Sequence, residues 1–130
     1  MIGDRTRIEQ VVSNLVYNSI KSISREIDKK EGRISIKIEK PRRKSIKIKG
    51  TKQMIEVVIE DNGEGIDPKI IPNLFTKFSK SIDGNGLGLY ISRKIIEAHG
   101  SKIWADNNKK NGAIFSFSLP VLNLPSKTIV

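Results

Sequence analysis

The chain has 130 residues, the size of one ordinary domain, and it can bury a core of sheet and helices without disulfides. It contains no cysteine, which excludes thiol nucleophiles, thiolate metal sites and disulfides, and its formal net charge is +10. No apolar run approaches the roughly 20 residues of a membrane-spanning helix, and the N-terminus lacks a signal-peptide pattern, so we expect a cytoplasmic domain without membrane contact.

The first predicted element is a helix over about residues 6–24. Thr6 and Glu9 have the spacing of a capping box, and apolar residues follow at mostly helical spacing. Asn14, Asn18 and Lys21 lie at i, i+4 and i+7, on one face beside this apolar stripe. Amide carbonyls bind hard cations and lysine neutralises phosphate oxygens, so this face suits a metal ion and phosphates. Taken alone, this face is more simply explained as a solvated helix shoulder with two asparagines facing water.

Three strands are predicted next, at about 33–40, 45–49 and 54–60. Almost the whole net charge falls within residues 21–53, where basic residues alternate with isoleucines such as Ile34, Ile36 and Ile38. This pattern predicts a half-buried hairpin with a solvated basic face. No aromatic residue lies between Lys21 and Lys52 to stack on bases, so no nucleic-acid partner is expected.

The third of these strands leads into a loop that begins Asp61-x-Gly63-x-Gly65. A carboxylate at the end of a strand can accept a hydrogen bond from an exocyclic amine such as that of adenine. The glycines allow the backbone to approach a flat ligand, and Ile66 can pack against its ring. A simple turn would also explain the sequence Asp-Asn-Gly.

The second half of the chain is predicted to hold a second long helix and a hairpin. Asp67-Pro68 indicates a short helical segment that reaches Leu74-Phe75. The glycine-rich residues 84–88 open the second helix, whose first N–H groups can face a polyphosphate. The helix closes at His99-Gly100, with Gly100 as a left-handed C-cap and His99 in a capping or solvated role. Strands follow at 102–105, with Trp104 expected in the core, and at 113–119; residues 121–130 form a tail.

This order of elements predicts a two-layer α/β sandwich in one domain, residues 1–130. Its mixed, largely antiparallel sheet is covered on one face by helices. The sequence matches neither the phosphate-binding loop nor the dinucleotide-binding fingerprint of the common nucleotide folds. It also lacks a recognisable Ser-His-Asp set and zinc-ligand spacing.

Four segments in order resemble the N, G1, F and G2 boxes of the sensor histidine kinases. They are IEQVVSNLVYNSIKSI, DNGEGI, LFTKF and GNGLGLYISRKIIEAHG, followed by a hairpin of the family type, SKIWADN and GAIFSFSLP. The resemblance runs from about Asp4 to Pro120. It implies the Bergerat-type ATP-binding fold shared with gyrase, a heat-shock chaperone and a mismatch-repair ATPase, with ATP and Mg²⁺ as cofactors. The family's strand upstream of the N box is not matched, so we expect a truncated N-terminus.

The resemblance also implies roles for individual residues. Asn18 matches the magnesium ligand, while Asn14 and Lys21 match residues that contact the phosphates. Asp61 matches the adenine-binding aspartate, and residues 78–85 match the mobile ATP lid. The other implied nucleotide-binding positions are Gly63, Gly65, Ile66, Phe78, Lys80, Gly86, Leu87, Gly88 and Leu89. No catalytic residue is assigned with certainty.

The implied activity is transfer of the γ-phosphoryl group of Mg-ATP to a histidine. That histidine lies on a phosphoacceptor and dimerisation domain of the same parent protein, and a response regulator is an indirect partner in two-component signalling. Relatives that hydrolyse ATP carry a general-base glutamate one helical turn before the magnesium ligand, where this chain has Asn14. The only histidine, His99, matches the end of the G2 helix instead of a phosphoacceptor motif.

An alternative from another class is a nucleotide-binding docking module, such as an anti-sigma-type regulator or a degenerate kinase. It would keep the fold without transferring phosphate. The four intact boxes favour the kinase. In isolation the domain is expected to be a monomer, and any membrane anchor of the parent protein would lie outside this chain.

Overall fold

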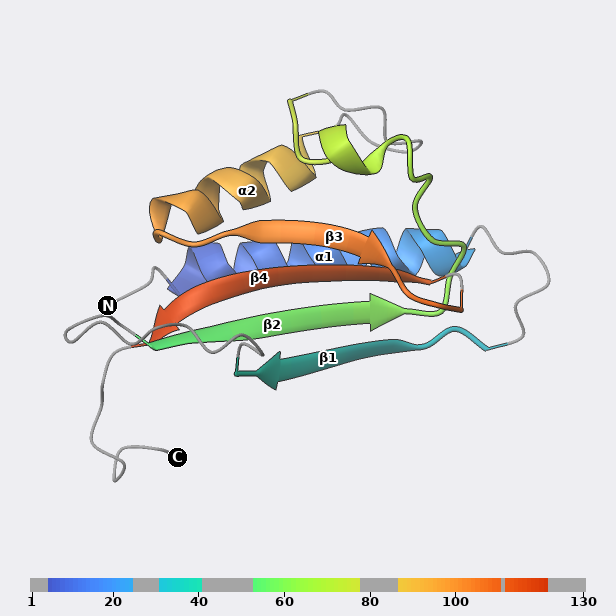
Figure 1. Ribbon diagram of the computed structural model, residues 1–130, viewed down its shortest axis with the longest axis horizontal. Helices are drawn as coiled ribbons and strands as arrows, with labels where there is room; N and C mark the ends of the chain where they lie inside the picture. Colours follow the sequence, from blue (N-terminus) through green and yellow to red (C-terminus); the bar gives the residue numbers. More distant parts are fainter. Residues whose placement is uncertain (1–4, 25–30, 41–52, 78–86, 111, 122–130) are drawn as a thin grey trace.

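The computed structural model describes residues 5–24, 31–40, 53–77, 87–110 and 112–121, and the statements below concern these residues. In chain order the elements are α1 (Arg5–Ser24), β1 (Ile34–Glu39), β2 (Gln53–Asp61), the 3-10 helix η1 (Ile71–Asn73), α2 (Gly88–Ala98), β3 (Ile103–Asn107) and β4 (Ala113–Val121). The strands form one antiparallel sheet in the order β1-β2-β4-β3, with α1 and α2 packed together against it (Figure 1). The predicted two-layer α/β sandwich is confirmed.

The core lies between the two helices and the two central strands. Strand residues alternate between faces, and the register pairs Ile59 with Phe115 and Val57 with Phe117 on the same face. That face packs against apolar residues of both helices, among them Leu15 and Ile96. The apolar stripe predicted for the first helix therefore contributes to the core through Val11 and Leu15, although Ile20, which belongs to the same apolar pattern, is 48% exposed.

The expected burial of the β1 isoleucines is wrong for two of the three. Ile34 packs against the core, but Ile36 and Ile38 are 52% and 69% exposed. β1 is an edge strand that pairs only with β2, while the buried core is centred on β2 and β4. The isoleucines share one face as predicted, but the helix layer does not cover its outer end.

Trp104 is also not the core residue that its strand position suggested. Its neighbours Ile103 and Ala105 pair with Phe117 and Phe115 and pack on the core. Trp104 therefore points to the opposite, open face of the sheet, where it is 39% exposed.

The two sequence signals for helix starts, Thr6 and Asp67, do not begin helices in the structure. Thr6 lies inside α1 and is therefore not the N-cap that the capping-box spacing suggested, and the Glu9 carboxylate accepts from Nε of Arg5 at 3.0 Å. Asp67 opens only a turn, in which its carboxylate accepts from the N–H of Lys69 at 2.9 Å, before the short η1. The predicted strand at 45–49 and the residues after 121 lie outside the described part of the chain.

The end of α2 agrees with the sequence in detail. Gly100 has φ +72°, and its N–H donates to the carbonyl of Glu97 while the N–H of Ser101 donates to that of Ile96. These are the two bonds of a Schellman motif. Nδ1 of His99 bonds the carbonyl of Ile95 at 2.7 Å, which confirms the capping role expected for this histidine.

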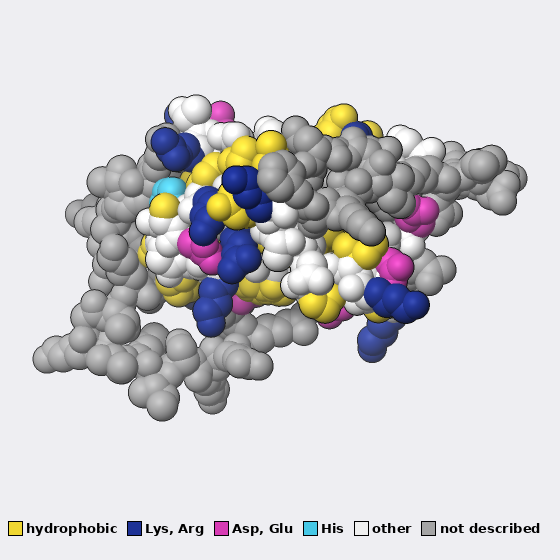
Figure 2. All heavy atoms as spheres, turned by 90° about the horizontal axis from the view of Figure 1, so that it is seen from above, with side chains coloured by type: hydrophobic (Ala, Val, Ile, Leu, Met, Phe, Trp, Pro, Cys, Tyr) yellow, Lys and Arg dark blue, Asp and Glu magenta, His cyan; other side chains and the backbone are white. Residues whose placement is uncertain are grey.

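Among the described helices, none is long and apolar enough to cross a bilayer. Seen from above, the surface around His99 (cyan) carries Lys and Arg side chains interleaved with hydrophobic and acidic ones (Figure 2). On α2, Arg93 and Lys94 lie within ion-pair distance of Glu97. The charge on this face of α2 is therefore partly compensated locally.

Candidate functional site

The two asparagines predicted on one face of α1 are joined to each other and to α2. Nδ2 of Asn14 donates to the carbonyl of Gly88 at 3.2 Å and to Oγ of Ser92 at 3.1 Å. Nδ2 of Asn18 donates to the carbonyl of Asn14 at 2.8 Å. Because both amide nitrogens are held by protein acceptors, the amide carbonyl oxygens are turned away from those bonds and are available to a ligand.

Lys21 continues the same face one turn later. Its ammonium group lies 4.6 Å from the centroid of the Tyr17 ring, a cation–π contact that restrains the long side chain. The side chain is only partly exposed. The cation is thus held over Tyr17, the residue before Asn18 on α1.

Asp61 is the last residue of β2 and is 2% exposed. One carboxylate oxygen, Oδ1, accepts from the N–H groups of Gly63 at 2.8 Å and of Ala113 at 3.2 Å. The other oxygen, Oδ2, is buried and has no hydrogen-bond partner in the described part of the chain. A buried carboxylate oxygen without a donor is costly, so Asp61 presents a strong acceptor to whatever ligand reaches it.

The glycines after Asp61 are required by geometry. A Cβ on Gly63 would overlap Oγ of Ser22 and lie 2.8 Å from the backbone carbon of that residue, so the loop passes directly against the last turn of α1. Gly65 has φ +81°, a conformation that strains residues with a side chain. Ile66 follows and is partly buried against the core. The loop that follows Asp61 is therefore packed between α1 and the core.

Two asparagines that the sequence analysis did not single out hold this loop in place. Asn107, at the end of β3, donates from Nδ2 to the carbonyl of Ile66 and accepts at Oδ1 from its N–H, both at 2.7 Å. Asn108 donates from Nδ2 to the backbone carbonyl of Asp61 at 3.1 Å. Both lie more than 40 residues from their partners, so only the fold brings them to the site.

We expect Asn107→Ala to lower the free energy of unfolding by about 1–2 kcal/mol, because both hydrogen bonds to the backbone of Ile66 are lost. Urea denaturation followed by circular dichroism measures this. Asn73→Ala is the matched control, since no hydrogen bond of the Asn73 side chain is recorded and the residue is exposed. Equal stability of the two variants would show that Asn107 does not hold the loop.

The start of α2 borders the same region. Gly88 is its first residue and accepts from Asn14, and the N-cap residue Leu87 has no side-chain cap for the first turn. The first N–H groups of a helix point toward its N-terminal end and are suited to an anion. Leu89, by contrast, is buried in the core. Phe78, Lys80, Gly86 and the predicted lid at 78–85 lie outside the described residues.

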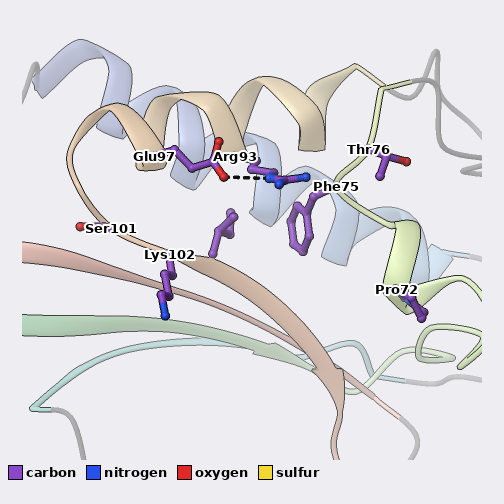
Figure 3. Close-up of a pocket in the computed structure, with 8 residues that line it drawn as sticks. Pro72, Phe75, Thr76, Arg93, Glu97, Ser101 and Lys102 are labelled. Atoms are coloured by element: carbon purple, nitrogen blue, oxygen red, sulfur yellow. Dashed lines mark hydrogen bonds and ion pairs between the residues drawn. The ribbon is translucent and has the colours of Figure 1, made fainter.

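Two open grooves beside α2 involve other residues. One, with a volume of about 330 Å³, lies between the η1 segment, α2 and the start of β3, and the Arg93–Glu97 ion pair of 3.0 Å lines it (Figure 3). The second, of about 490 Å³, lies between the outer surfaces of α1 and α2. Neither groove is lined by a predicted nucleotide-binding residue, so they are separate from the site around Asp61.

Comparisons with known proteins agree with this arrangement. A profile of the family described as Histidine kinase-, DNA gyrase B-, and HSP90-like ATPase matches residues 3–123. The sensor protein FixL of Bradyrhizobium diazoefficiens is 37% identical over 92% of this chain and 22% of its own length. The sensor protein KdpD of Clostridium acetobutylicum is 38% identical over 90% of this chain and 12% of its own. The solved catalytic domain of histidine kinase ThkA superimposes with a TM-score of 0.69 at 36% identity, over 91% of this chain and 69% of that one.

Because the profile matches nearly the whole chain, the protein belongs to the family of histidine kinase-, DNA gyrase B- and HSP90-like ATPases. Within that family it is a catalytic domain of the sensor histidine kinase type, as its relatives and structural neighbours are. The chain spans about a fifth of the length of FixL and less of KdpD.

Proposed function

We propose that this domain binds Mg-ATP and transfers the terminal phosphoryl group to a histidine on a separate phosphoacceptor domain of its parent protein. The bond between the terminal phosphorus and the bridging oxygen breaks, a bond from phosphorus to an imidazole nitrogen forms, and ADP leaves. The imidazole releases its proton to solvent. A response regulator would be the next acceptor of the phosphoryl group.

The observation that carries this proposal is the free oxygen of Asp61. Oδ2 is an acceptor without a donor at the buried end of β2, and the exocyclic amine of adenine is a donor that can reach such a position edge-on. Ile66 lies at the same loop and can pack against the base. The phosphates would then extend toward Asn14, Asn18 and the start of α2.

The residues on α1 are suited to magnesium bound together with phosphates. Among the described residues no group of three or more His, Cys, Asp and Glu could hold a metal ion, so an all-protein cage is not available there. Magnesium commonly takes one or two protein oxygens and fills its shell with substrate oxygens and water. The carbonyl oxygen of Asn18 is the group we assign to it; when bound, the ion neutralises charge on the phosphates.

The same face supports phosphoryl transfer over hydrolysis. Asn14 occupies the position of a hydrolase's general base, and its amide is already bonded to Gly88 and Ser92 of α2. An amide does not accept a proton from water at neutral pH, so Asn14 braces the two helices and cannot activate a water nucleophile. Catalysis would rest on positioning and charge neutralisation, with the nucleophile supplied by another domain.

Titration with a non-hydrolysable ATP analogue, with and without magnesium, tests the nucleotide part of this proposal. We expect saturable binding that tightens with magnesium and is much weaker for the GTP analogue. A docking module that has lost its nucleotide site would bind neither analogue. Such a result would remove the kinase assignment for this chain.

We expect Asn18→Ala to remove most of the gain in ATP affinity that magnesium provides, about tenfold or more, because a ligand to the ion is lost. Adenosine, which carries no phosphate, should bind as before. Calorimetric titration of each ligand at fixed ionic strength measures both effects, with Asn73→Ala as a surface control. An unchanged magnesium effect in Asn18→Ala would show that the ion is held elsewhere.

A further inference from the structure

Three buried side-chain oxygens in the described part of the chain have no hydrogen-bond partner. They are Oδ2 of Asp61, Oγ of Ser19 and Oγ of Ser22. The residues are 2%, 0% and 8% exposed. Buried polar atoms are nearly always bonded to protein or to ordered water, and leaving one unpaired is unfavourable. The proposed function accounts for Asp61 but leaves both serines unexplained.

The serines belong to the same region as Asp61. Ser19 and Ser22 are one turn apart on the buried face of α1, in its last two turns. Gly63 passes so close to Ser22 that a Cβ there would overlap the Ser22 hydroxyl, and the N–H of Gly63 donates to Asp61 at 2.8 Å. Gly63 therefore lies against the hydroxyl group of Ser22 and is bonded to the carboxylate of Asp61.

The serines of α1 do not all lack a hydrogen-bond partner. Ser24, two residues further on, donates to the carbonyl of Ile20 at 2.9 Å, which is the usual partner of a serine within a helix. Neither Ser19 nor Ser22 makes such a bond, although both are more buried than Ser24. Their hydroxyl groups are thus left to serve a ligand or a water molecule beside Asp61.

We propose that Ser22 is a second base-recognising residue of the nucleotide site, whose hydroxyl donates to a ring nitrogen next to the exocyclic amine of adenine. The contact is direct or passes through one water that Ser19 also holds. This inference rests on the proposed function. An ionised carboxylate only accepts, so Asp61 can match the amine but not the ring nitrogens N1 and N7, which are themselves acceptors. A hydroxyl supplies the missing donor.

The pair also accounts for selection against other purines. Guanine and hypoxanthine carry a carbonyl oxygen where adenine has its amine, and that oxygen would face Oδ2 of Asp61 without a proton between them. Two buried acceptors in contact are unfavourable. Asp61 and Ser22 together therefore present an acceptor and a donor, the complement of the amine and ring nitrogen of adenine.

The test compares ATP with 1-deaza-ATP and 7-deaza-ATP, each of which lacks one ring nitrogen, in the wild type and in Ser22→Ala. We expect Ser22→Ala to bind ATP about five- to tenfold more weakly, the effect of one lost hydrogen bond. In the wild type, one of the two analogues should show a similar loss. Ser22→Ala should lose nothing further with that analogue, while Ser24→Ala should match the wild type with every ligand.

The outcomes separate this inference from the proposed function. If the wild type does not bind ATP, the proposed function fails. If the wild type binds ATP but Ser22→Ala binds it equally well, or weakens equally for ATP and both analogues, only the role of Ser22 is overturned. If the wild type binds ATP, 1-deaza-ATP and 7-deaza-ATP with equal affinity, the role of Ser22 is also overturned. This measurement uses only the wild type, so it does not depend on whether Ser22→Ala folds.

Discussion

Asp61→Asn is expected to weaken ATP binding by roughly 2–3 kcal/mol, or about 30- to 150-fold. The reason is geometric. Oδ1 of Asp61 is fixed by the N–H groups of Gly63 and Ala113, so an asparagine would keep its carbonyl oxygen there. Its amide NH₂ would then replace Oδ2 and face the adenine amine, placing two donors against each other without an acceptor.

Calorimetric titration of ATP measures this loss, and circular dichroism checks that Asp61→Asn remains folded. Asp67→Asn is the matched control, since Asp67 is exposed and its carboxylate accepts only from the N–H of Lys69 among the recorded bonds. Its ATP affinity should equal that of the wild type. Tight binding by a folded Asp61→Asn would place the adenine elsewhere and remove the main support for the proposed site.

The sequence predicted those parts of the site whose geometry follows from local spacing. Asn14 and Asn18 are four residues apart in a helix and therefore share a face, and Asp61 follows an apolar strand and therefore stands at its end. The turn at Gly100 is likewise a local matter of one left-handed residue. In each case a few neighbouring residues determine the conformation, so the pattern is sufficient.

Contacts between segments that are distant in the sequence could not be predicted in this way, because no local sequence pattern indicates them. Asn107 reaches Ile66 across 41 residues of sequence, and an asparagine near the end of a strand looks the same whether it clamps a loop or faces water. Ser22 likewise resembles any helical serine until Gly63 is packed against it. These positions are set by the packing of β3 and α1 against the loop after β2, which periodicity does not encode.

The sequence also did not determine which sheet surface is covered. Alternation shows that Ile36 and Ile38 share a face, but not whether another layer lies over it. The same limit explains Trp104, whose size suggested the core although its position in the alternation places it on the open face. The edge position of β1 decides the first case, and the register of β3, whose neighbours Ile103 and Ala105 face the core, decides the second.

The isolated chain is expected to carry no phosphate after incubation with ATP and to turn ATP over only slowly, whereas a phosphoacceptor domain added separately should become labelled on histidine. Its only histidine, His99, follows the last residue of α2, while the proposed phosphate site is at the first. The 11 residues of that helix span about 16 Å, far beyond the roughly 3–3.5 Å of an attacking atom. Nδ1 of His99 is also bonded to Ile95.

The measurement uses ATP labelled at the terminal phosphate, with the chain alone and with the acceptor domain of its own parent protein, and scores an acid-labile, base-stable label. His99→Asn is the control for self-modification and should transfer phosphate as the wild type does, because His99 lies at the distant end of α2. A label on the isolated chain that disappears in His99→Asn would identify a self-modifying enzyme. Rapid ATP hydrolysis that Asn14→Ala abolishes would instead indicate a hydrolase. Either result would contradict the proposal that this domain binds and orients ATP while another domain supplies the nucleophile. That proposal follows from Asn14, because its amide cannot act as the general base that would activate water.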